Sequence, residues 1–304
     1  MRRSMDRRGF LKSALASGGL LAATSAEGVL SQAFAAKTGS GGKKKFEISL
    51  AAWSLNRTFR TTWTNLDLPR ITREEFGLDG LEFVNGFFDL PNYEYMRELK
   101  RRADYHGVNL LLIMVDREGD MSHEDKEERA QAAINHRKWV DIAHYLGCHS
   151  IRCNAGYTEV GTVDERVSRA AESFRSLVEY ADQAGINVII ENHGGLSSMP
   201  DKLISLVKQV GHPRFGTLPD FGNFPPEIDK FEAVKKLMPY AKAVSAKCYD
   251  FAPDGTHPAY DLDRMVEIVL AAGYSGYIGI EFEGREMSPH DGVMACKRVL
   301  QRHQ

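Results

Sequence analysis

Short apolar segments alternate with amphipathic helical segments along most of this chain, and this alternation restricts the fold more than any other sequence feature. Apolar, β-rich runs occur at 46–53, 80–84, 109–114, 150–154, 187–191, 214–218, 243–246 and 277–281. Helical periodicity occurs at 93–106, 126–146, 163–184, 203–210, 230–238, 262–272 and 289–302. This pattern is typical of a parallel sheet that is covered by helices.

Eight such strands with their helices predict a single (β/α)8 TIM barrel over residues 46–304. A doubly wound sheet would give a similar alternation. It usually has a glycine-rich phosphate-binding turn after its first strand, however, and here that strand is followed by Ser54-Leu55. Helical periodicity is poor only at 55–79, where Thr-rich and Pro-containing patches predict a loop followed by a short helix.

The first 35 residues have the composition of an export signal. Arg7 and Arg8 precede Gly-Phe-Leu-Lys and an apolar Ala/Leu/Gly stretch, and Ala33-Phe34-Ala35 is a small-x-small cleavage site. An ordinary Sec signal is the alternative, but the arginine pair in this setting favours the twin-arginine translocase as export partner. The apolar stretch is too short to anchor the chain stably in a membrane. We predict a signal at 1–35, a flexible linker at 36–45 and a periplasmic or secreted protein.

The net charge argues against a nucleic-acid-binding protein, and the cysteine spacing argues against a cysteine-based zinc or redox site. Residues 1–35 carry five Lys/Arg and two Asp/Glu, so the formal net charge falls from −2 to −5 when they are removed. This balance gives no basic footprint for nucleic acid. The four cysteines, at 148, 153, 248 and 296, have no Cys-x-x-Cys spacing. We therefore expect buried free thiols rather than a zinc knot or a redox motif.

Acidic residues stand at the ends of three of the last four predicted strands: Glu191, Asp220 and Glu281. The carboxyl ends of barrel strands meet at one mouth, which is where TIM barrels carry their active sites. A carboxylate that is buried there needs a nearby cation, because desolvation of an unpaired charge costs several kcal/mol. A divalent metal ion bound by the three carboxylates would meet this need.

The nearby basic residues allow another interpretation. Each acid could instead cap the following helix or pair with a side chain such as Arg152, Lys247 or Arg285. Lys247 itself could act as a base with a lowered pKa or hold a substrate oxyanion. It could also simply form a salt bridge to Asp250 or Glu281.

Four motifs at these strand ends resemble those of a known family. They are Glu-Asn-His at 191–193, Asp-Phe-Gly-Asn at 220–223, the lysine at 247, and Ile-Glu-Phe-Glu-Gly at 280–284. Together they are similar to the xylose isomerase-like barrels that are often named sugar phosphate isomerases/epimerases, and most similar to a twin-arginine-exported bacterial branch. The resemblance covers about 46–300. The family includes ketose 3-epimerases, inosose dehydratases, hydroxypyruvate isomerases and endonuclease IV-type nucleases, so it constrains the fold more than the reaction.

The resemblance also implies a ligand set for the metal. The matching positions in this sequence are Glu191, Asp220, Ser245 and Glu281. Ser245 replaces the histidine that is usual in the family, and a hydroxyl is a weaker ligand, so the fourth ligand is either Ser245 or His193. His193 could equally hydrogen-bond the substrate. Asn223 replaces the histidine of an Asp-x-x-His pattern, which speaks against a multinuclear zinc nuclease. The cofactor is expected to be Mn²⁺, Mg²⁺, Co²⁺ or Zn²⁺.

These residues predict proton transfer next to the carbonyl of an unphosphorylated sugar or keto-sugar derivative. Glu191 or Glu281 would remove the carbon-bound proton, and the metal with Lys247 or His193 would stabilise the enediolate. The candidates for substrate binding are Trp53, Asn85, Arg152, Asn154, Asn223 and Phe224.

Two alternatives stay open at this point. Isomerisation, epimerisation and β-elimination begin with the same step, so a lyase that acts on keto-glycosides is one alternative. The other is a non-catalytic periplasmic carbohydrate-binding barrel that has lost its metal, which the serine at 245 favours and the three acids oppose. The sequence predicts a carbohydrate ligand but no oligomeric state.

Replacing Arg7 and Arg8 together with lysine tests the predicted export route. Because the translocase receptor reads the arginine pair, the unprocessed precursor should accumulate in the cytoplasm. Fractionation followed by mass measurement of the N-terminus shows the result. Normal periplasmic processing of the double variant would contradict the assignment.

Overall fold

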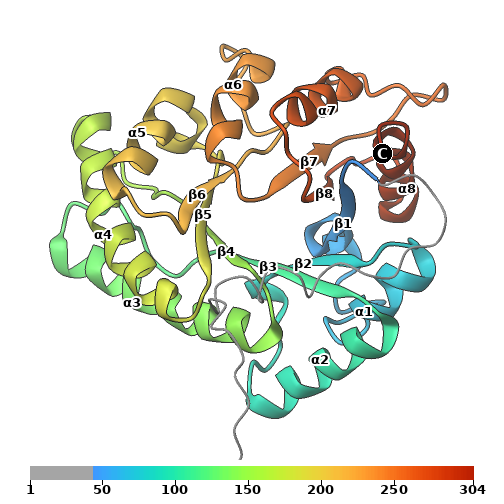
Figure 1. Ribbon diagram of the computed structural model, residues 1–304, viewed down its shortest axis with the longest axis horizontal. Helices are drawn as coiled ribbons and strands as arrows, with labels where there is room; N and C mark the ends of the chain where they lie inside the picture. Colours follow the sequence, from blue (N-terminus) through green and yellow to red (C-terminus); the bar gives the residue numbers. More distant parts are fainter. Residues whose placement is uncertain (1–43) are drawn as a thin grey trace, which may run out of the picture. The chain divides into compact units, whose positions relative to one another are not determined.

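The computed structural model describes residues 44–304, so the predicted signal and nearly all of the predicted linker lie outside the described part. Eight strands line the centre and the helices lie around them (Figure 1). The strands are β1 Glu47–Ala51, β2 Gly80–Val84, β3 Asn109–Val115, β4 Ser150–Cys153, β5 Asn187–Glu191, β6 Phe215–Leu218, β7 Val244–Cys248 and β8 Tyr277–Phe282.

The strand order confirms the barrel and excludes a doubly wound sheet. The order is β6-β5-β4-β3-β2-β1-β8-β7 with every pair parallel, so the first strand pairs with the last. Between β6 and β7 only isolated bridges form, at Thr217–Ala241 and Asp220–Ser245. Proline has no N–H to donate, so Pro219 interrupts a regular ladder at this closure.

Within residues 44–304, six of the seven long helices begin at a residue whose side chain caps the helix, and three end at a left-handed glycine. The seven helices are α2 Tyr93–His106, α3 Lys126–Leu146, α4 Val163–Gln183, α5 Pro200–Val210, α6 Lys230–Leu237, α7 Leu262–Ala271 and α8 Pro289–Gln301. Thr162 and Glu165 form a reciprocal capping box at the start of α4. Gly107 and Gly147 end α2 and α3 in the left-handed conformation that glycine adopts at low cost. No helix within 44–304 is long and apolar enough to cross a membrane.

The first crossover contains short helical pieces, as the sequence predicted. A 3-10 segment, η1 Ala52–Thr58, follows β1, and the short helix α1 Leu68–Arg70 continues into a π-helical turn, η2 Ile71–Glu75. Aromatic rings hold this segment against the barrel: Phe59 lies 4.4 Å from Phe87, and Trp53 stacks on Phe87 at 5.8 Å between ring centroids. The packing fixes Trp53 at the mouth.

Two strand boundaries differ from the predicted ones in a way that affects the site. β1 ends at Ala51 rather than at residue 53, so Trp53 stands beyond the strand. β7 continues to Cys248 rather than ending at residue 246, because Lys247 and Cys248 pair with β8. Ser245 and Lys247 are therefore alternate residues of one strand and point to the same side.

The barrel interior contains one acid that lies deeper than the strand ends. Glu82 on β2 is 2% exposed, and Ser49 Oγ donates a 2.6 Å hydrogen bond to its carboxylate. A Cβ at Gly279 would lie 2.4 Å from a Glu82 carboxylate oxygen. The glycine therefore leaves room for this carboxyl group.

Gly279→Ala should lower the free energy of unfolding by ~1–3 kcal/mol, because the added methyl overpacks the position that Glu82 occupies. Gly86→Ala is the matched control, since a Cβ at Gly86 has no neighbour within 4 Å. Urea unfolding of both variants measures the difference. Equal stabilities would mean that the barrel interior has more space than the structure shows.

Candidate functional site

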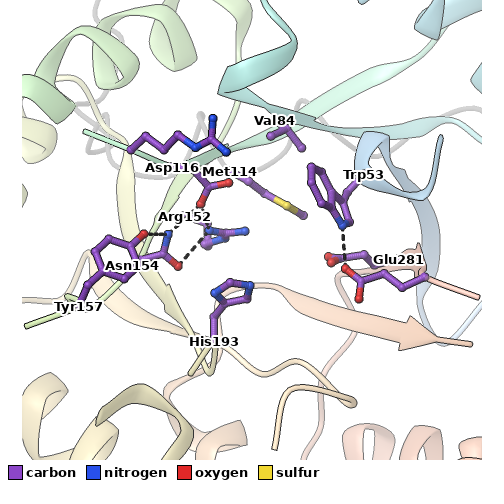
Figure 2. Close-up of a pocket in the computed structure, with 11 residues that line it drawn as sticks. Trp53, Val84, Met114, Asp116, Arg152, Asn154, Tyr157, His193 and Glu281 are labelled. Atoms are coloured by element: carbon purple, nitrogen blue, oxygen red, sulfur yellow. Dashed lines mark hydrogen bonds and ion pairs between the residues drawn. The ribbon is translucent and has the colours of Figure 1, made fainter. Parts of the chain in front are cut away.

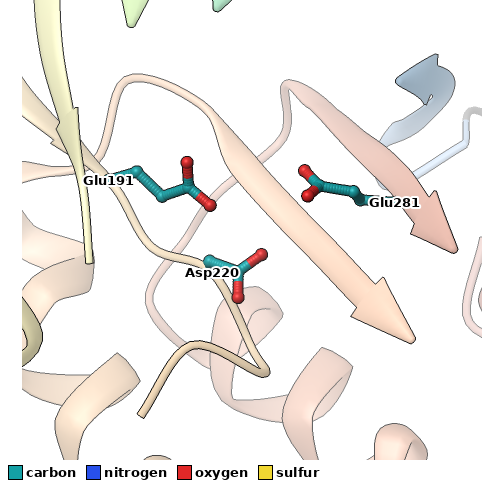
Figure 3. Close-up of side chains that lie close together, drawn as sticks. All are labelled: Glu191, Asp220 and Glu281. Carbon is teal, nitrogen blue, oxygen red and sulfur yellow. The ribbon is translucent and has the colours of Figure 1, made fainter. Parts of the chain in front are cut away.

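Three carboxylates from different strands come together at the mouth of the barrel. Glu191 ends β5, Asp220 follows β6 and Glu281 lies on β8, and Figure 3 shows their side chains pointing toward one another. One oxygen from each lies within 4.8 Å of the other two. Their exposed fractions are only 1%, 0% and 4%, so the cluster is closed off from bulk water.

Backbone contacts hold Asp220 in place. Its Oδ1 accepts hydrogen bonds from the N–H groups of Gly222 at 2.9 Å and Asn223 at 2.8 Å. Asn192 binds the Asp220 backbone twice, accepting from its N–H at 2.7 Å and donating to its carbonyl at 2.9 Å. Ser245 Oγ donates to Asp220 Oδ2 at 2.7 Å. The carboxylate therefore has little freedom to turn away from the cluster.

Two buried cations neutralise the other acids in part. Lys247 Nζ lies 2.9 Å from a Glu281 oxygen and 3.2 Å from Glu283. Arg152 Nε lies 2.9 Å from Glu191 Oε2. Pairing with cations, the alternative interpretation of the sequence, is thus present for two of the three acids.

Two residues that the sequence suggested as ion-pair partners, Asp250 and Arg285, make other contacts. Asp250 does not pair with Lys247; it accepts backbone hydrogen bonds from residues 285 to 287. Arg285 contributes its backbone N–H to that turn and forms no ion pair with the cluster. Within residues 44–304, no side-chain ion pair reaches Asp220.

Even with these two ion pairs, the cluster of Glu191, Asp220 and Glu281 has the features of a cation-binding site. Arg152 is close to Glu191 Oε2, but its N–H is not aligned, so this buried oxygen has no hydrogen-bond donor within residues 44–304. Burial, helped by the charges of Glu191 and Glu281 and opposed by Lys247, raises the pKa of Asp220 to about 8. Burial also raises the pKa of Glu191 above its ordinary value, although Arg152 opposes this. A free oxygen in an acid cluster with excess negative charge fits a divalent cation.

The two candidates for the fourth ligand occupy different places. Ser245 Oγ lies inside the cluster, 2.7 Å from Asp220 and 3.4 Å from Glu281. His193 is not among the side chains within residues 44–304 that lie close enough together to share an ion with Glu191, Asp220 and Glu281. Its ring is exposed and points into the pocket from the loop after β5 (Figure 2). The three carboxylates are therefore the residues that would hold a metal.

A pocket of about 380 Å³ opens beside Glu281 (Figure 2). Trp53 forms one wall, and its Nε1 donates to Glu283 at 2.7 Å. Arg152, Asn154 and His193 lie across from it. Four predicted site residues, namely Trp53, Arg152, Asn154 and His193, are thus brought together with Glu281 around one cavity.

Three predicted substrate-binding residues lie outside this pocket lining. Asn85 is buried, and both ends of its amide bind the backbone of Asp116. Asn223 donates to Glu191 Oε1 at 2.8 Å and lines a neighbouring hollow instead. Phe224 is 9% exposed and belongs to the core cluster. In the structure these contacts make the three residues supports of the site, and their contact with a substrate stays a prediction.

The sequence reasoning missed several residues of the pocket. Asp116 follows β3 directly, and Arg152 and Asn154 both donate to its carboxylate, at 2.9 and 2.7 Å. Arg152 and its neighbours hold the pKa of Asp116 below its ordinary value despite burial. Tyr157 and Glu283 also line the pocket. A polar residue at or just after the end of a strand was the available sign for Asp116, as it was for Glu191 and Asp220.

Comparison with known proteins agrees with this architecture. A structure of L-ribulose 3-epimerase has a TM-score of 0.72 at 15% identity and covers 85% of this chain and 94% of that one. 3-Keto-D-glucoside 4-epimerase from E. coli gives a TM-score of 0.68 at 16% identity, covering 85% and 100%. A xylose isomerase-like TIM barrel protein from Mycobacterium smegmatis, in complex with magnesium, gives 0.64 at 18%, covering 85% and 97%. At these identities the structures share the fold.

One curated protein matches a shorter part of the sequence. The C-glycoside deglycosidase alpha subunit of Arthrobacter globiformis is 35% identical over 72 residues, which is 22% of this chain and 20% of that protein. The family model for the xylose isomerase-like TIM barrel matches residues 73–303. These residues include β2 to β8 and all three clustered acids, so the chain belongs to the xylose isomerase-like TIM barrel family.

Proposed function

We propose that this protein is a divalent-metal-dependent isomerase or epimerase of an unphosphorylated sugar or keto-sugar derivative. The buried cluster of Glu191, Asp220 and Glu281 next to a sugar-sized pocket is the observation that supports it most. The proposed reaction begins with removal of the proton on the carbon next to a carbonyl, which gives an enediolate. The similar structures that are named as epimerases of L-ribulose and of a 3-keto-D-glucoside support this class.

The side chains have distinct tasks in this proposal. Glu281 lines the pocket and Glu191 stands across the cluster, so either carboxylate can take the carbon-bound proton. A divalent ion, when bound, supplies positive charge that stabilises negative charge on a substrate oxygen. Burial disfavours the charge on Lys247, but Glu281 and the other acids outweigh it and raise its pKa above the ordinary value. Lys247 therefore stays protonated and serves as a cation rather than as the base.

The pocket walls would orient the sugar. The exposed part of Trp53 offers an aromatic face of the kind that stacks on the apolar side of a pyranose. Asn154 and Tyr157, joined by a 2.7 Å hydrogen bond, offer polar groups to hydroxyls on the opposite side.

We also propose that the enzyme is exported by the twin-arginine translocase and works in the periplasm. Sugar phosphates are scarce in that compartment.

Elimination from a keto-glycoside is the second candidate, and the position of His193 favours it. His193 lines the pocket beside Glu281 and also two adjoining hollows, of about 460 and 180 Å³. A glycoside with its sugar over the acids and its second part in a hollow would pass this ring, which could protonate the departing aglycone at its oxygen or, in a C-glycoside, at its carbon. The match to a C-glycoside deglycosidase subunit supports the same idea. Release of the aglycone from a 3-keto-glycoside, rather than a change of configuration, would identify this reaction.

Metal dependence predicts a pH-dependent stabilisation. The pKa of Asp220 is about 8 in the folded protein and 3.8 in a free side chain, so between these values the folded state binds more protons than the unfolded state. The stability of the metal-free protein should therefore fall as the pH rises from about 4 to 8. Adding Mn²⁺ should raise the melting temperature, and more at pH 8 than at pH 5.5, because the ion competes with protons.

Asp220→Asn should lose both the metal response and this part of the pH dependence, whereas Glu286→Gln, at an exposed acid, should keep them. Differential scanning calorimetry in each buffer measures these effects. An unchanged melting temperature with Mn²⁺, Mg²⁺, Co²⁺ and Zn²⁺ at pH 8 would favour the non-catalytic carbohydrate-binding alternative.

The amide substitutions Glu191→Gln and Glu281→Gln test the proposed base. Each keeps the shape of the side chain but removes its charge and its ability to accept a proton, so turnover should fall at least ~10²-fold. Exchange of substrate protons with deuterated water, followed by NMR on a panel of unphosphorylated aldoses, ketoses and 3-keto-glycosides, measures the step. Glu286→Gln is the matched control and should exchange at the rate of the unchanged protein. Near-normal exchange in both site variants would place the chemistry elsewhere.

A further inference from the structure

Arg117 follows β3 at the barrel mouth and has a left-handed backbone, with φ of +62°. This region is disfavoured for a residue with a Cβ and is normally occupied by glycine. Within residues 44–304, twelve glycines have positive φ, and the only other residues that do are Arg60 and Arg117. A glycine would make this turn more easily, so the course of the backbone does not account for an arginine here.

The residues on both sides of Arg117 are held firmly. Asn85 accepts from the N–H of Asp116 at 3.0 Å and donates to its carbonyl oxygen at 2.9 Å. On the other side, Trp139 Nε1 donates to the carboxylate of Glu118 at 2.6 Å. These contacts keep the turn in place and hold Arg117 where it lines the pocket.

The guanidinium of Arg117 has no partner, unlike the other arginine of the pocket. Arg152 is in ion pairs with Asp116 and Glu191. Across the described 44–304, Arg117 takes part in no ion pair or hydrogen bond, even though Asp116 is its neighbour in the chain. The carboxylate of Asp116 is directed to Arg152 and Asn154 instead. The pocket therefore has, at its solvent-exposed rim, one guanidinium whose hydrogen-bond donors contact no protein group within residues 44–304.

We propose that Arg117 binds a carboxylate substituent of the substrate, so that the pocket selects a sugar acid over the corresponding neutral sugar. A guanidinium can bind a carboxylate through two parallel hydrogen bonds. A phosphate dianion fits less well, because Asp116, Glu281 and Glu283 line the same pocket and repel additional negative charge. This inference rests on the proposed function, since it takes the same pocket as the substrate site.

Calorimetric titration of the full chain loaded with Mn²⁺ tests the proposal. The ligands are methyl glycosides of uronic acids, each paired with the neutral methyl glycoside of the same configuration, in the gluco, galacto and manno series. At least one acid should bind ~10-fold or more tightly than its neutral partner, and Arg117→Gln should remove that preference. Arg60→Gln is the matched control, because Arg60 also has positive φ but pairs with Asp89 at 2.7 Å.

Several outcomes would overturn the assignment. One is that no acid binds more tightly than its neutral partner, and another is that the preference for the acid survives in Arg117→Gln. A third is that the 6-phosphates of the same methyl glycosides, titrated in the same way, bind more tightly than the uronides. A second variant separates binding from folding: Arg117→Gly should retain or raise the melting temperature. A clear fall would mean that the arginine serves the fold, which also contradicts the proposal.

The two proposals fail in different ways. Proton exchange on neutral sugars with no preference for acids would reject the role of Arg117 alone. A preference for acids that depends on Arg117, without proton exchange on any sugar, would reject the proposed reaction but keep the binding site.

Discussion

The compensation of buried negative charge is the constraint on which the site depends. Glu191, Asp220 and Glu281 lie too close together and too deep for water to stabilise three carboxylates. Arg152 and Lys247 offset part of this charge, but each is shared with a second acid. Four carboxylates thus share these two cations, and Asp220 has no ion pair within residues 44–304. The remaining excess of negative charge explains why a divalent ion suits the centre better than a further salt bridge would.

Amide side chains orient the backbone that carries this charge. Asn192 and Asn85 bind the backbones of Asp220 and Asp116 in the same way, each with one donated and one accepted hydrogen bond. Both asparagines are buried, so each binds a peptide that would otherwise have unsatisfied polar groups. Uncharged amides therefore hold the backbones of Asp220 and Asp116 in place, and no further charge has to be buried in order to position these two acids.

The serine at position 245 changes the balance of the site. A histidine there would bring a neutral nitrogen ligand, whereas the Ser245 hydroxyl donates a hydrogen bond to Asp220 at 2.7 Å and lies 3.4 Å from a Glu281 oxygen. The hydroxyl stabilises the ionised acids and leaves the three carboxylates as the ligands that fit a metal. Such an all-oxygen set suits hard ions such as Mg²⁺ and Mn²⁺ better than ions that prefer nitrogen.

The sequence by itself determined the barrel and the three acids at its mouth. Alternating periodicity specifies strands and helices, and parallel strands in a barrel bring their carboxyl ends together, so neighbours in strand order become neighbours in space. Only the tertiary structure decided how the polar groups are shared. Asn85 and Phe224 look like mouth residues in the sequence, yet one binds a backbone and the other packs in the core. Arg152 and Arg117 are both arginines near strand ends, yet one is neutralised and the other is free. Hydrogen bonds and ion pairs form only where the distance between two segments is right to within a few tenths of an ångström. Local sequence patterns do not specify such distances between segments that are far apart in the chain.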